Sequence, residues 1–315
     1  MRRPYIFPLP ASRRCAATVV APGKLEVREV PTPTPNASQI RVRLEGCGVC
    51  ASNIPPWEGR PWFHYPLAPG QLGHEAWGYV DAVGRDVLRC RLGQRVAMLS
   101  ESAYAEFDVA TEDKVVPLPD SLANKPFPAE PLGCAMNILH RSDIRTGQTV
   151  AIIGIGFLGA VMTGLLAQKN IRVFAIARRP FAQHVARHMG ATQVIPMEDH
   201  GRIIESVRQL TGGQFCDVVI EATGKQWPLD LAGEITRERG RLVIAGYHQD
   251  GPRQVNMQLR NWRGLDVINA HERDPRVYRR GMEEAVQAVA TERDPKSNFN
   301  KLVRRDNVHG HHGEA

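Results

Sequence analysis

The chain lacks any apolar run that approaches the roughly 18 residues of a membrane-spanning helix. Its first twenty residues are basic and interrupted by prolines, and they lack the continuous apolar stretch of a secretory signal. The sequence also has no internal repeat, heptad pattern or low-complexity segment. These absences, with an ordinary 43% of hydrophobic residues over 315 positions, predict a soluble, cytoplasmic protein without a membrane partner.

Cysteine is scarce. Six cysteines are scattered along the chain, and a cytoplasmic setting argues against disulfides. Cys47 and Cys50, in the stretch EGCGVCASN, form a CxxC pair. Such a pair is a redox couple, half of a structural zinc site, or one functional thiol beside one that only packs. The pair by itself leaves these three interpretations open.

The net charge of +7 raises the question of a nucleic-acid partner. The excess comes from arginines dispersed along the chain, without a basic helix or an alternation of aromatic and basic residues. We therefore expect no nucleic-acid partner. A solvated surface and affinity for a small polyanion account for the charge.

From residue 149 onward, short apolar runs alternate with segments of helical spacing. Continuous apolar runs are typical of strands buried on both faces of a parallel sheet. The runs occupy residues 149–154, 171–177, 216–224, 240–246 and 265–270, with a weaker one at 192–195. The pattern predicts an α/β domain with a doubly wound parallel sheet, the Rossmann fold, over residues 136–271.

Residues 1–135 have a different pattern and are predicted to form a second domain. Short β-branched segments are separated by prolines and glycines, which is typical of a small antiparallel barrel or sandwich. Residues 272–315 are expected to be a short C-terminal return segment, truncated or disordered, with a polar, histidine-rich end that frays.

Gly154, Gly156 and Gly159 form a G-x-G-x-x-G motif between the first of the apolar strands and a helix. There, Gly154 makes the tight turn, Gly156 lets the backbone approach a pyrophosphate, and Gly159 allows helix and strand to pack closely. The amino end of the helix, near Phe157 and Leu158, presents free N–H groups to the phosphates. The motif predicts a dinucleotide site, with a glycine-rich turn that binds no ligand as the alternative.

The end of the second strand indicates which dinucleotide is bound. An NAD site typically places Asp or Glu there, about 20 residues past the glycines, to bond the ribose 2′-hydroxyl. This chain has Arg178 and Arg179 instead. Because a guanidinium binds a 2′-phosphate that a carboxylate would repel, we expect a preference for NADP(H) over NAD(H). Two solvated arginines at a strand end are the alternative.

His74 and Glu75 lie where an extended strand is expected to begin. Together with Cys50 and Glu130 they supply a thiolate, an imidazole and carboxylates, a ligand set suited to zinc. Cys134, four residues beyond Glu130, is the alternative third ligand.

These motifs resemble those of the zinc-dependent medium-chain dehydrogenases, which include alcohol, polyol and threonine dehydrogenases. The resemblance extends from about Cys15 to His271 and rests on GCGVCASN, GHEAWGYVDAVG, EPLGCA and GIGFLG, in that order. It implies an N-terminal GroES-like β-barrel domain that carries the catalytic zinc, followed by the cofactor-binding Rossmann domain. It also implies a homo-oligomer, either a dimer or a tetramer.

Position by position, the resemblance implies that Cys50, His74 and Glu130 hold one catalytic zinc ion. Glu75 matches a residue that contacts the metal ligands in some members and binds the metal itself in others. Ser52 matches the Ser or Thr that touches the substrate oxygen and passes on its proton.

The chain departs from the family in three ways. The stretch MLSESAYAEF runs through the place of the four-cysteine structural zinc lobe, so one zinc per chain is expected. Asn53 and Pro55 stand where the family has an Asp and, in some members, a relay His. The 44 residues after His271 do not show the closing strands and helix that usually complete the first domain. With Cys50 as a zinc ligand, Cys47 is interpreted as a packed neighbour, because redox chemistry would need the CxxC to open a helix in a βαβ unit.

The sequence thus predicts an alcohol dehydrogenase-like oxidoreductase that moves a hydride between an alcohol and NADP(H). Glu130 resembles the polyol branch, which suggests a polyol, sugar or cyclitol. Tyr247 and His248, like His271 and Glu272, follow late strands and are candidates to line the nicotinamide or substrate pocket, or else are structural loop residues. The alternatives are a zinc-free NADPH-dependent quinone or enone reductase and a non-catalytic NADP(H)-binding protein.

Overall fold

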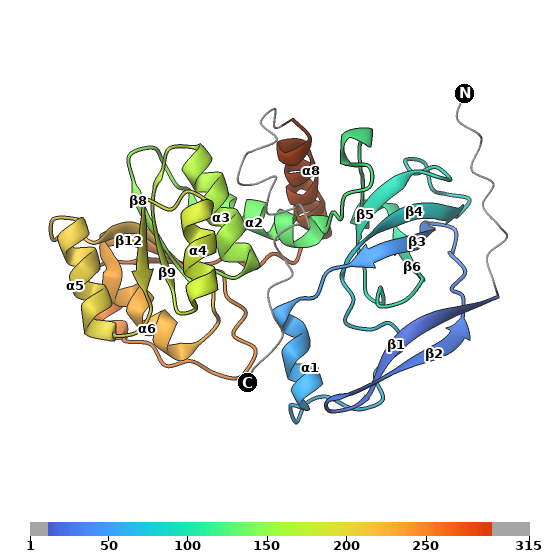
Figure 1. The fold of residues 1–315 in the computed structure, drawn as a ribbon, viewed down its shortest axis with the longest axis horizontal. Helices are drawn as coiled ribbons and strands as arrows, with labels where there is room; N and C mark the ends of the chain where they lie inside the picture. The colour runs from blue at the N-terminus through green and yellow to red at the C-terminus, as the bar shows by residue number, and fades with distance from the viewer. Residues whose placement is uncertain (1–11, 292–315) are drawn as a thin grey trace. The chain divides into compact units, whose positions relative to one another are not determined.

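The computed structural model describes residues 12–291, which divide into two compact units (Figure 1). Unit 1 contains the described residues up to Gly133 together with Asp274–Thr291, and unit 2 is Cys134–Arg273. The chain therefore builds most of unit 1, then unit 2, and returns to unit 1 with its last described helix.

Unit 2 contains one parallel sheet of six strands in the order β10-β9-β8-β11-β12-β13. The strands are β8 (Thr149–Ile153), β9 (Arg172–Ala177), β10 (Gln193–Pro196), β11 (Cys216–Glu221), β12 (Thr236–Ile244) and β13 (Asp266–Asn269). β9 and β10 lie on one side of β8 and the later strands on the other, so the strand order reverses at β8. This is the doubly wound fold that the apolar runs predicted, and each predicted run overlaps a strand.

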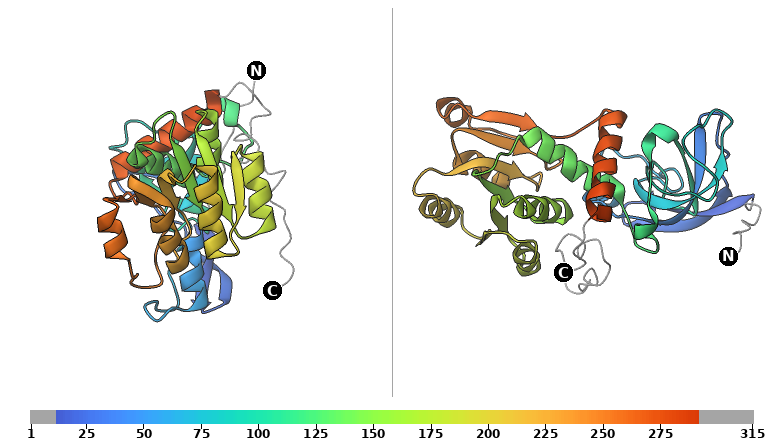
Figure 2. Two further views of the ribbon diagram at one scale, coloured as in Figure 1. Left: turned by 90° about the vertical axis from the view of Figure 1, so that its left-hand side faces the viewer. Right: turned by 90° about the horizontal axis from the view of Figure 1, so that it is seen from above.

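Helices cover both faces of this sheet. α3 (Phe157–Gln168) and α4 (Pro180–His188) lie on one face, and α5 (His200–Leu210) and α6 (Gln226–Ile235) on the other (Figures 1 and 2). α5 illustrates why: Ile203 and Val207, one turn apart, are buried, and the Asp199 side chain caps the helix by accepting a hydrogen bond from Arg202 N. A shorter helix, α7 (Met257–Trp262), precedes β13.

Unit 1 is mainly antiparallel. β1 (Arg13–Ala21) and β2 (Lys24–Pro31) form a two-stranded sheet, and five more strands form a second sheet in the order β6-β3-β4-β5-β7. These are β3 (Gln39–Cys47), β4 (Glu75–Val83), β5 (Arg95–Leu99), β6 (Phe107–Thr111) and β7 (Val115–Pro117). Short helices η1 (Ala51–Asn53) and α1 (Ile54–Glu58) follow β3, η2 (Glu112–Lys114) and η3 (Asp120–Leu122) flank β7, and α2 (Ala129–Ser142) leads into unit 2. This is the GroES-like domain that the sequence predicted.

A β-bulge interrupts the pairing of β3 with β4. Leu44 pairs with Gly78 and Gly46 with Trp77, so Glu45 is the extra residue. A Cβ on Gly46 would lie 2.4 Å from the Trp77 ring, so only glycine fits where the two strands meet.

The expectation that no closing helix follows His271 is wrong. Helix α8 (Pro275–Thr291) belongs to unit 1 and buries Met282 and Ala285. A Cβ on Gly133 of α2 would lie 2.9 Å from Met282 N, so the two helices pack closely. The predicted frayed tail lies outside the described residues. None of the described helices is long and apolar enough to cross a membrane.

A partly buried ion pair connects β5 to the bulge of β3 in unit 1. Arg95 Nε of β5 is 2.5 Å from a carboxylate oxygen of Glu45, the bulge residue. The same guanidinium donates to the carbonyl oxygens of Leu122 (2.8 Å) and Lys125 (2.7 Å). Arg95 therefore joins the sheet to the segment that leads into α2.

Replacing Arg95 with methionine should lower the free energy of unfolding by about 3 kcal/mol, because Glu45 and two carbonyl groups would lose their donor. Urea denaturation measures the effect. The matched control is Arg28→Met, which removes an exposed pair with Glu26 and should change stability by less than about 0.5 kcal/mol. Equal effects of the two substitutions would contradict the role of Arg95.

Candidate functional site

Three side chains that can bind a metal meet in unit 1. One potential ligand atom each from Cys50, His74 and Glu75 lies within 4.8 Å of the other two. His74 Nε2 is 3.9 Å from Glu75 Oε1, and the Glu75 carboxylate is buried. A thiolate, an imidazole and a carboxylate are ligand types that zinc prefers, so the donor set fits this ion.

Local backbone structure places these groups. Cys50 is the extended N-cap residue of η1, three residues after the end of β3. The carbonyl oxygen of Leu72 accepts a hydrogen bond from His74 Nδ1 at 2.9 Å, which leaves Nε2 as the free ligand atom. Glu75 begins β4, and its carbonyl oxygen accepts a hydrogen bond from Gly48 N at 3.0 Å. The end of β3 and the start of β4 thus bring the thiol to the imidazole.

The electrostatics of the cluster suit a cation. The hydrogen bond with Cys50 raises the pKa of His74 to about 9, with a further contribution from the charge of Glu130. Burial raises the pKa of Glu75 to about 7, and the charge of Glu130 adds to this effect. Acidic groups crowded in a desolvated place repel one another, and a bound cation relieves that repulsion.

Glu130 lies outside the group of three. It occupies the first turn of α2, is buried, and accepts a hydrogen bond through Oε1 from Tyr278 Oη of α8 at 2.8 Å. The structure therefore brings together Cys50 and His74 of the predicted ligand set, and the carboxylate nearest to them is Glu75. Cys134 is half-buried one turn further along α2 and is also outside the group.

The residues around Cys50 have separate roles. Ser52 is half-buried in η1, two positions after the thiol. Burial raises the pKa of Cys47 to about 12, and its Sγ is 3.3 Å from Gly48 O. A thiol that stays protonated at neutral pH is a poor redox partner, which supports the interpretation of Cys47 as a packed residue.

Tyr104 is a further part of this region that none of the sequence motifs indicated. Asn53 Nδ2 donates to Tyr104 Oη at 2.5 Å, and the same hydroxyl donates to Gly48 O at 3.1 Å. Tyr104 therefore ties the turn after Cys50 to the end of β3. It lies about 50 residues away in sequence, and no motif marks it.

The glycine motif of unit 2 has the geometry of a phosphate-binding turn. Gly154 has φ +96, and a Cβ on Gly159 would lie 2.1 Å from Gly154 O, so both positions need glycine. A Cβ on Gly156 would meet nothing within 4 Å, which is open space where a ligand can approach the backbone. Gly156 is also the N-cap of α3 and has no side-chain capping bond. The exposed Phe157 and the half-buried Leu158 begin the helix.

Arg178 and Arg179 lie at the end of β9 and are exposed. Arg179 is the N-cap of α4. Neither guanidinium has a hydrogen bond or ion pair with another of the residues 12–291. Both are therefore available to a ligand phosphate.

The loops after β11 and β12 contain a polar network that the sequence only partly indicated. Glu221, the last residue of β11, is fully buried and is 3.0 Å from His248 Nε2 through its carboxylate. Tyr247 beside it is exposed, and its ring centroid lies 5.8 Å from that of His271. In the sequence, Glu221 is recognisable only as the charged residue that ends the apolar run CDVVIE.

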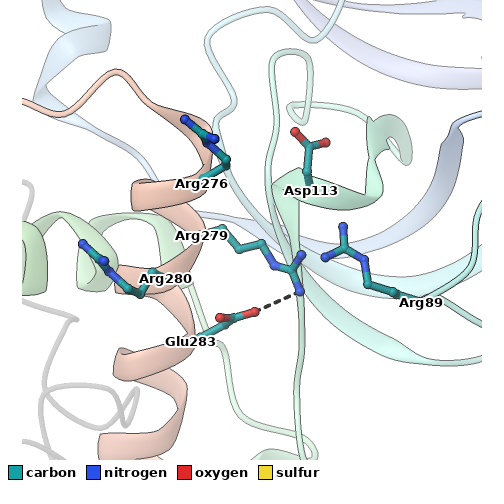
Figure 3. A pocket seen from close by; sticks show the side chains of 6 residues that line it. All are labelled: Arg89, Asp113, Arg276, Arg279, Arg280 and Glu283. Carbon is teal, nitrogen blue, oxygen red and sulfur yellow. Dashed lines mark ion pairs between the residues drawn. The ribbon is translucent and has the colours of Figure 1, made fainter.

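One pocket of unit 1, of about 500 Å³, contains none of the predicted site residues (Figure 3). Figure 3 shows Arg279 turned toward Arg89 and paired with Glu283, while Arg280 points the other way. Arg276 and Arg89 also have carboxylate neighbours, in Asp274 and Glu112. Most of the charged side chains that line this pocket are therefore paired with charges of opposite sign in the protein. The lining residues are Arg89, Asp113, Arg276, Arg279, Arg280 and Glu283.

Two models of known families match this chain. A model described as alcohol dehydrogenase GroES-like domain matches residues 36–120, and one described as zinc-binding dehydrogenase matches residues 158–291. The chain belongs to the zinc-type medium-chain dehydrogenase/reductase family. It is therefore an alcohol dehydrogenase-like oxidoreductase.

Relatives within this family differ in activity. A sorbitol dehydrogenase of Halalkalibacterium halodurans is 23% identical over 80% of this chain and 82% of its own length. A quinone oxidoreductase of Pseudomonas aeruginosa is 29% identical over 81% of this chain and 79% of its own. The solved structure of a Sinorhizobium meliloti protein bound to NADP has a TM-score of 0.77 and 22% identity, covering 93% of this chain and 96% of its own, which shows the shared fold.

Replacing Gly48 with alanine tests the placement of Glu75. The new Cβ would lie 1.9 Å from Glu75 Oε2, so the carboxylate must move away from Cys50 and His74. We expect affinity for Zn²⁺ or Co²⁺, measured by titration, to fall about 10–100-fold. Gly201→Ala is the control, because its Cβ would meet only Asp199 Oδ1 at 3.6 Å, an ordinary contact. Unchanged metal affinity in Gly48→Ala would refute this placement.

Proposed function

We propose that this protein is a zinc-dependent oxidoreductase that transfers a hydride between an alcohol and NADP(H). The observation that carries the proposal is the convergence of Cys50, His74 and Glu75 in a GroES-like unit, on a chain whose second unit has a dinucleotide-binding turn. The family and the two types of site support the same reaction.

Cys50 and His74 would hold one zinc ion per chain, with a buried carboxylate as third ligand. The proximity of Glu75 to Cys50 and His74 supports Glu75 as that carboxylate. Glu130, which the family resemblance favoured, is the second candidate, and its charge acts on both His74 and Glu75. The two carboxylates can be separated by experiment.

A zinc ion at this place would supply Lewis-acid chemistry at the substrate oxygen, so that an alcohol loses its proton more easily. The protein's own residues orient the reaction. Leu72 O fixes the His74 ring, and Gly48 N holds the backbone of Glu75. The Ser52 hydroxyl would accept the alcohol proton and pass it to solvent, while the hydride moves between the substrate carbon and the nicotinamide ring.

A secondary or polyhydric alcohol is the proposed substrate class, since relatives include sorbitol and (R,R)-butanediol dehydrogenases. The second candidate is NADPH-dependent quinone reduction, because the Pseudomonas aeruginosa relative that is 29% identical is a quinone oxidoreductase. The cluster of Cys50, His74 and Glu75 favours the first candidate, since quinone reduction by NADPH needs no metal ligands.

Elemental analysis of the purified protein should find about one zinc per chain. Cys50→Ala should lose the zinc and alcohol-dependent reduction of NADP⁺, yet still bind NADPH, because the cofactor turn is in unit 2. Cys47→Ala is the matched control and should keep its zinc. The same assay on Glu75→Gln and Glu130→Gln identifies the third ligand. Zinc-free wild-type protein that reduces quinones with NADPH would replace this proposal by the second candidate.

The cofactor preference depends on Arg178 and Arg179. Replacing both with alanine should weaken NADPH binding about 10–100-fold, since charge-assisted hydrogen bonds are worth about 1.5–3 kcal/mol, and leave NADH binding nearly unchanged. Fluorescence titration with both cofactors measures this. Arg187→Ala is the control, because Arg187 lies in the last turn of α4, the helix whose N-cap is Arg179. Equal affinity of the wild-type protein for NADH and NADPH would overturn the assignment.

A further inference from the structure

The loops after β11 and β12 are joined through one buried carboxylate. Glu221 Oε1 accepts hydrogen bonds from Thr223 N (2.7 Å), Thr223 Oγ1 (2.5 Å) and Gly224 N (3.0 Å). Its other oxygen faces His248 Nε2 at 3.0 Å. Its carbonyl oxygen accepts from both Ala245 N and Gly246 N at 2.8 Å. Glu221 therefore determines the path of both loops.

The hydrogen bonds of His248 fix its tautomer. Arg253 Nε donates to His248 Nδ1 at 2.9 Å, and because a guanidinium only donates, Nδ1 must accept. The proton of the neutral ring is then on Nε2 and points at Glu221. Arg253 also donates to Gly224 O at 2.8 Å and pairs with Asp250, which in turn pairs with Lys225. We call Glu221, His248 and Arg253 the loop clamp.

The clamp leaves no room for side chains between the two loops. A Cβ on Gly246 would lie 2.2 Å from Gly224 N and 2.8 Å from Glu221 Oε2. A Cβ on Gly224, which has φ +72, would lie 2.6 Å from Tyr247 O. Tyr247 lies between these contacts, so its backbone is fixed while its side chain remains exposed.

The clamp also touches the glycine motif. A Cβ on Gly154 would lie 2.4 Å from Thr223 Cγ2, and Glu221 holds Thr223 by two hydrogen bonds. β11 is the strand next to β8 in the sheet, and β12 follows it. A dinucleotide bound at a doubly wound sheet spans the switch point, with one nucleotide over each half of the sheet. Since Arg178 and Arg179 lie after β9, on the other half, the loops after β11 and β12 face the nicotinamide half.

We propose that Glu221 and His248 are positioning residues that hold Tyr247 and the backbone of residues 245–248 in the shape that receives the nicotinamide half of the cofactor. The inference rests on the proposed NADP(H) function. It assigns the adenosine half and the nicotinamide half to separate groups of residues, which can be tested one at a time.

The experiment compares two probes by isothermal titration calorimetry: NADPH, which uses both halves, and 2′,5′-ADP, which carries only the adenosine half with its 2′-phosphate. His248→Ala should weaken NADPH binding about tenfold and leave 2′,5′-ADP binding unchanged. His248→Gln should restore much of the NADPH affinity, because its amide N–H can still donate to Glu221. Emission of bound NADPH reports on the nicotinamide environment and should change in the alanine variant only.

The matched control is Asp217→Asn. Asp217 lies at the opposite end of β11, accepts a hydrogen bond from Thr149 N at 2.7 Å and pairs with Arg237. The Asp217→Asn substitution should lower thermal stability and should not weaken the binding of one probe more than that of the other. If His248→Ala weakens both probes equally, or neither, the clamp has only a structural role and the inference is wrong. If the wild-type protein binds neither probe, the proposed cofactor is wrong and the inference fails with it.

Discussion

The candidate metal site depends on how closely the end of β3 approaches the start of β4. Three positions there have no space for a side chain: a Cβ would lie 2.4 Å from the Trp77 ring at Gly46, 1.9 Å from Glu75 Oε2 at Gly48, and 2.1 Å from Arg43 O at Gly78. Because β3 and β4 pair this closely, with Cys47 opposite Ala76, the thiol that follows β3 lies beside the residues that begin β4. The cluster is therefore a consequence of strand pairing, and its ligands come from opposite ends of a long connection.

Two buried glutamates show how the same chemical group serves different purposes. Glu221 is satisfied by donors from Thr223, Gly224 and His248, so its charge is compensated and it orders the loops around it. Glu75 instead faces Cys50 and His74 and is repelled by the charge of Glu130, which helps to raise its pKa to about 7. A carboxylate held in this way gains from a cation, whereas Glu221 has no need of one.

The sequence predicted features that depend on local patterns, and it was less successful where distant segments meet. Apolar runs located every strand of the parallel sheet, because strands buried on both faces must be apolar. The glycine motif located the turn between β8 and α3, because that turn is formed by consecutive residues. The sequence did not indicate α8, whose burial depends on Gly133 more than 140 residues earlier. The sequence favoured Glu130 as the third ligand and did not indicate its hydrogen-bond partner, because Tyr278 is 148 residues away.

In the proposed reaction, the path of the substrate proton depends on the residues around Cys50. The resemblance to the family places Asn53 and Pro55 where members carry an Asp and, in some of them, a relay histidine, and neither Asn53 nor Pro55 can take up a proton at neutral pH. Tyr104 lies close by, but burial raises its pKa above the ordinary range, so it stays protonated and its hydroxyl is committed to Asn53 and Gly48 O. A group fixed in this way holds the loop in place and does not carry protons. The proposed reaction therefore uses the half-buried Ser52 hydroxyl to pass the proton on, with solvent as the final acceptor.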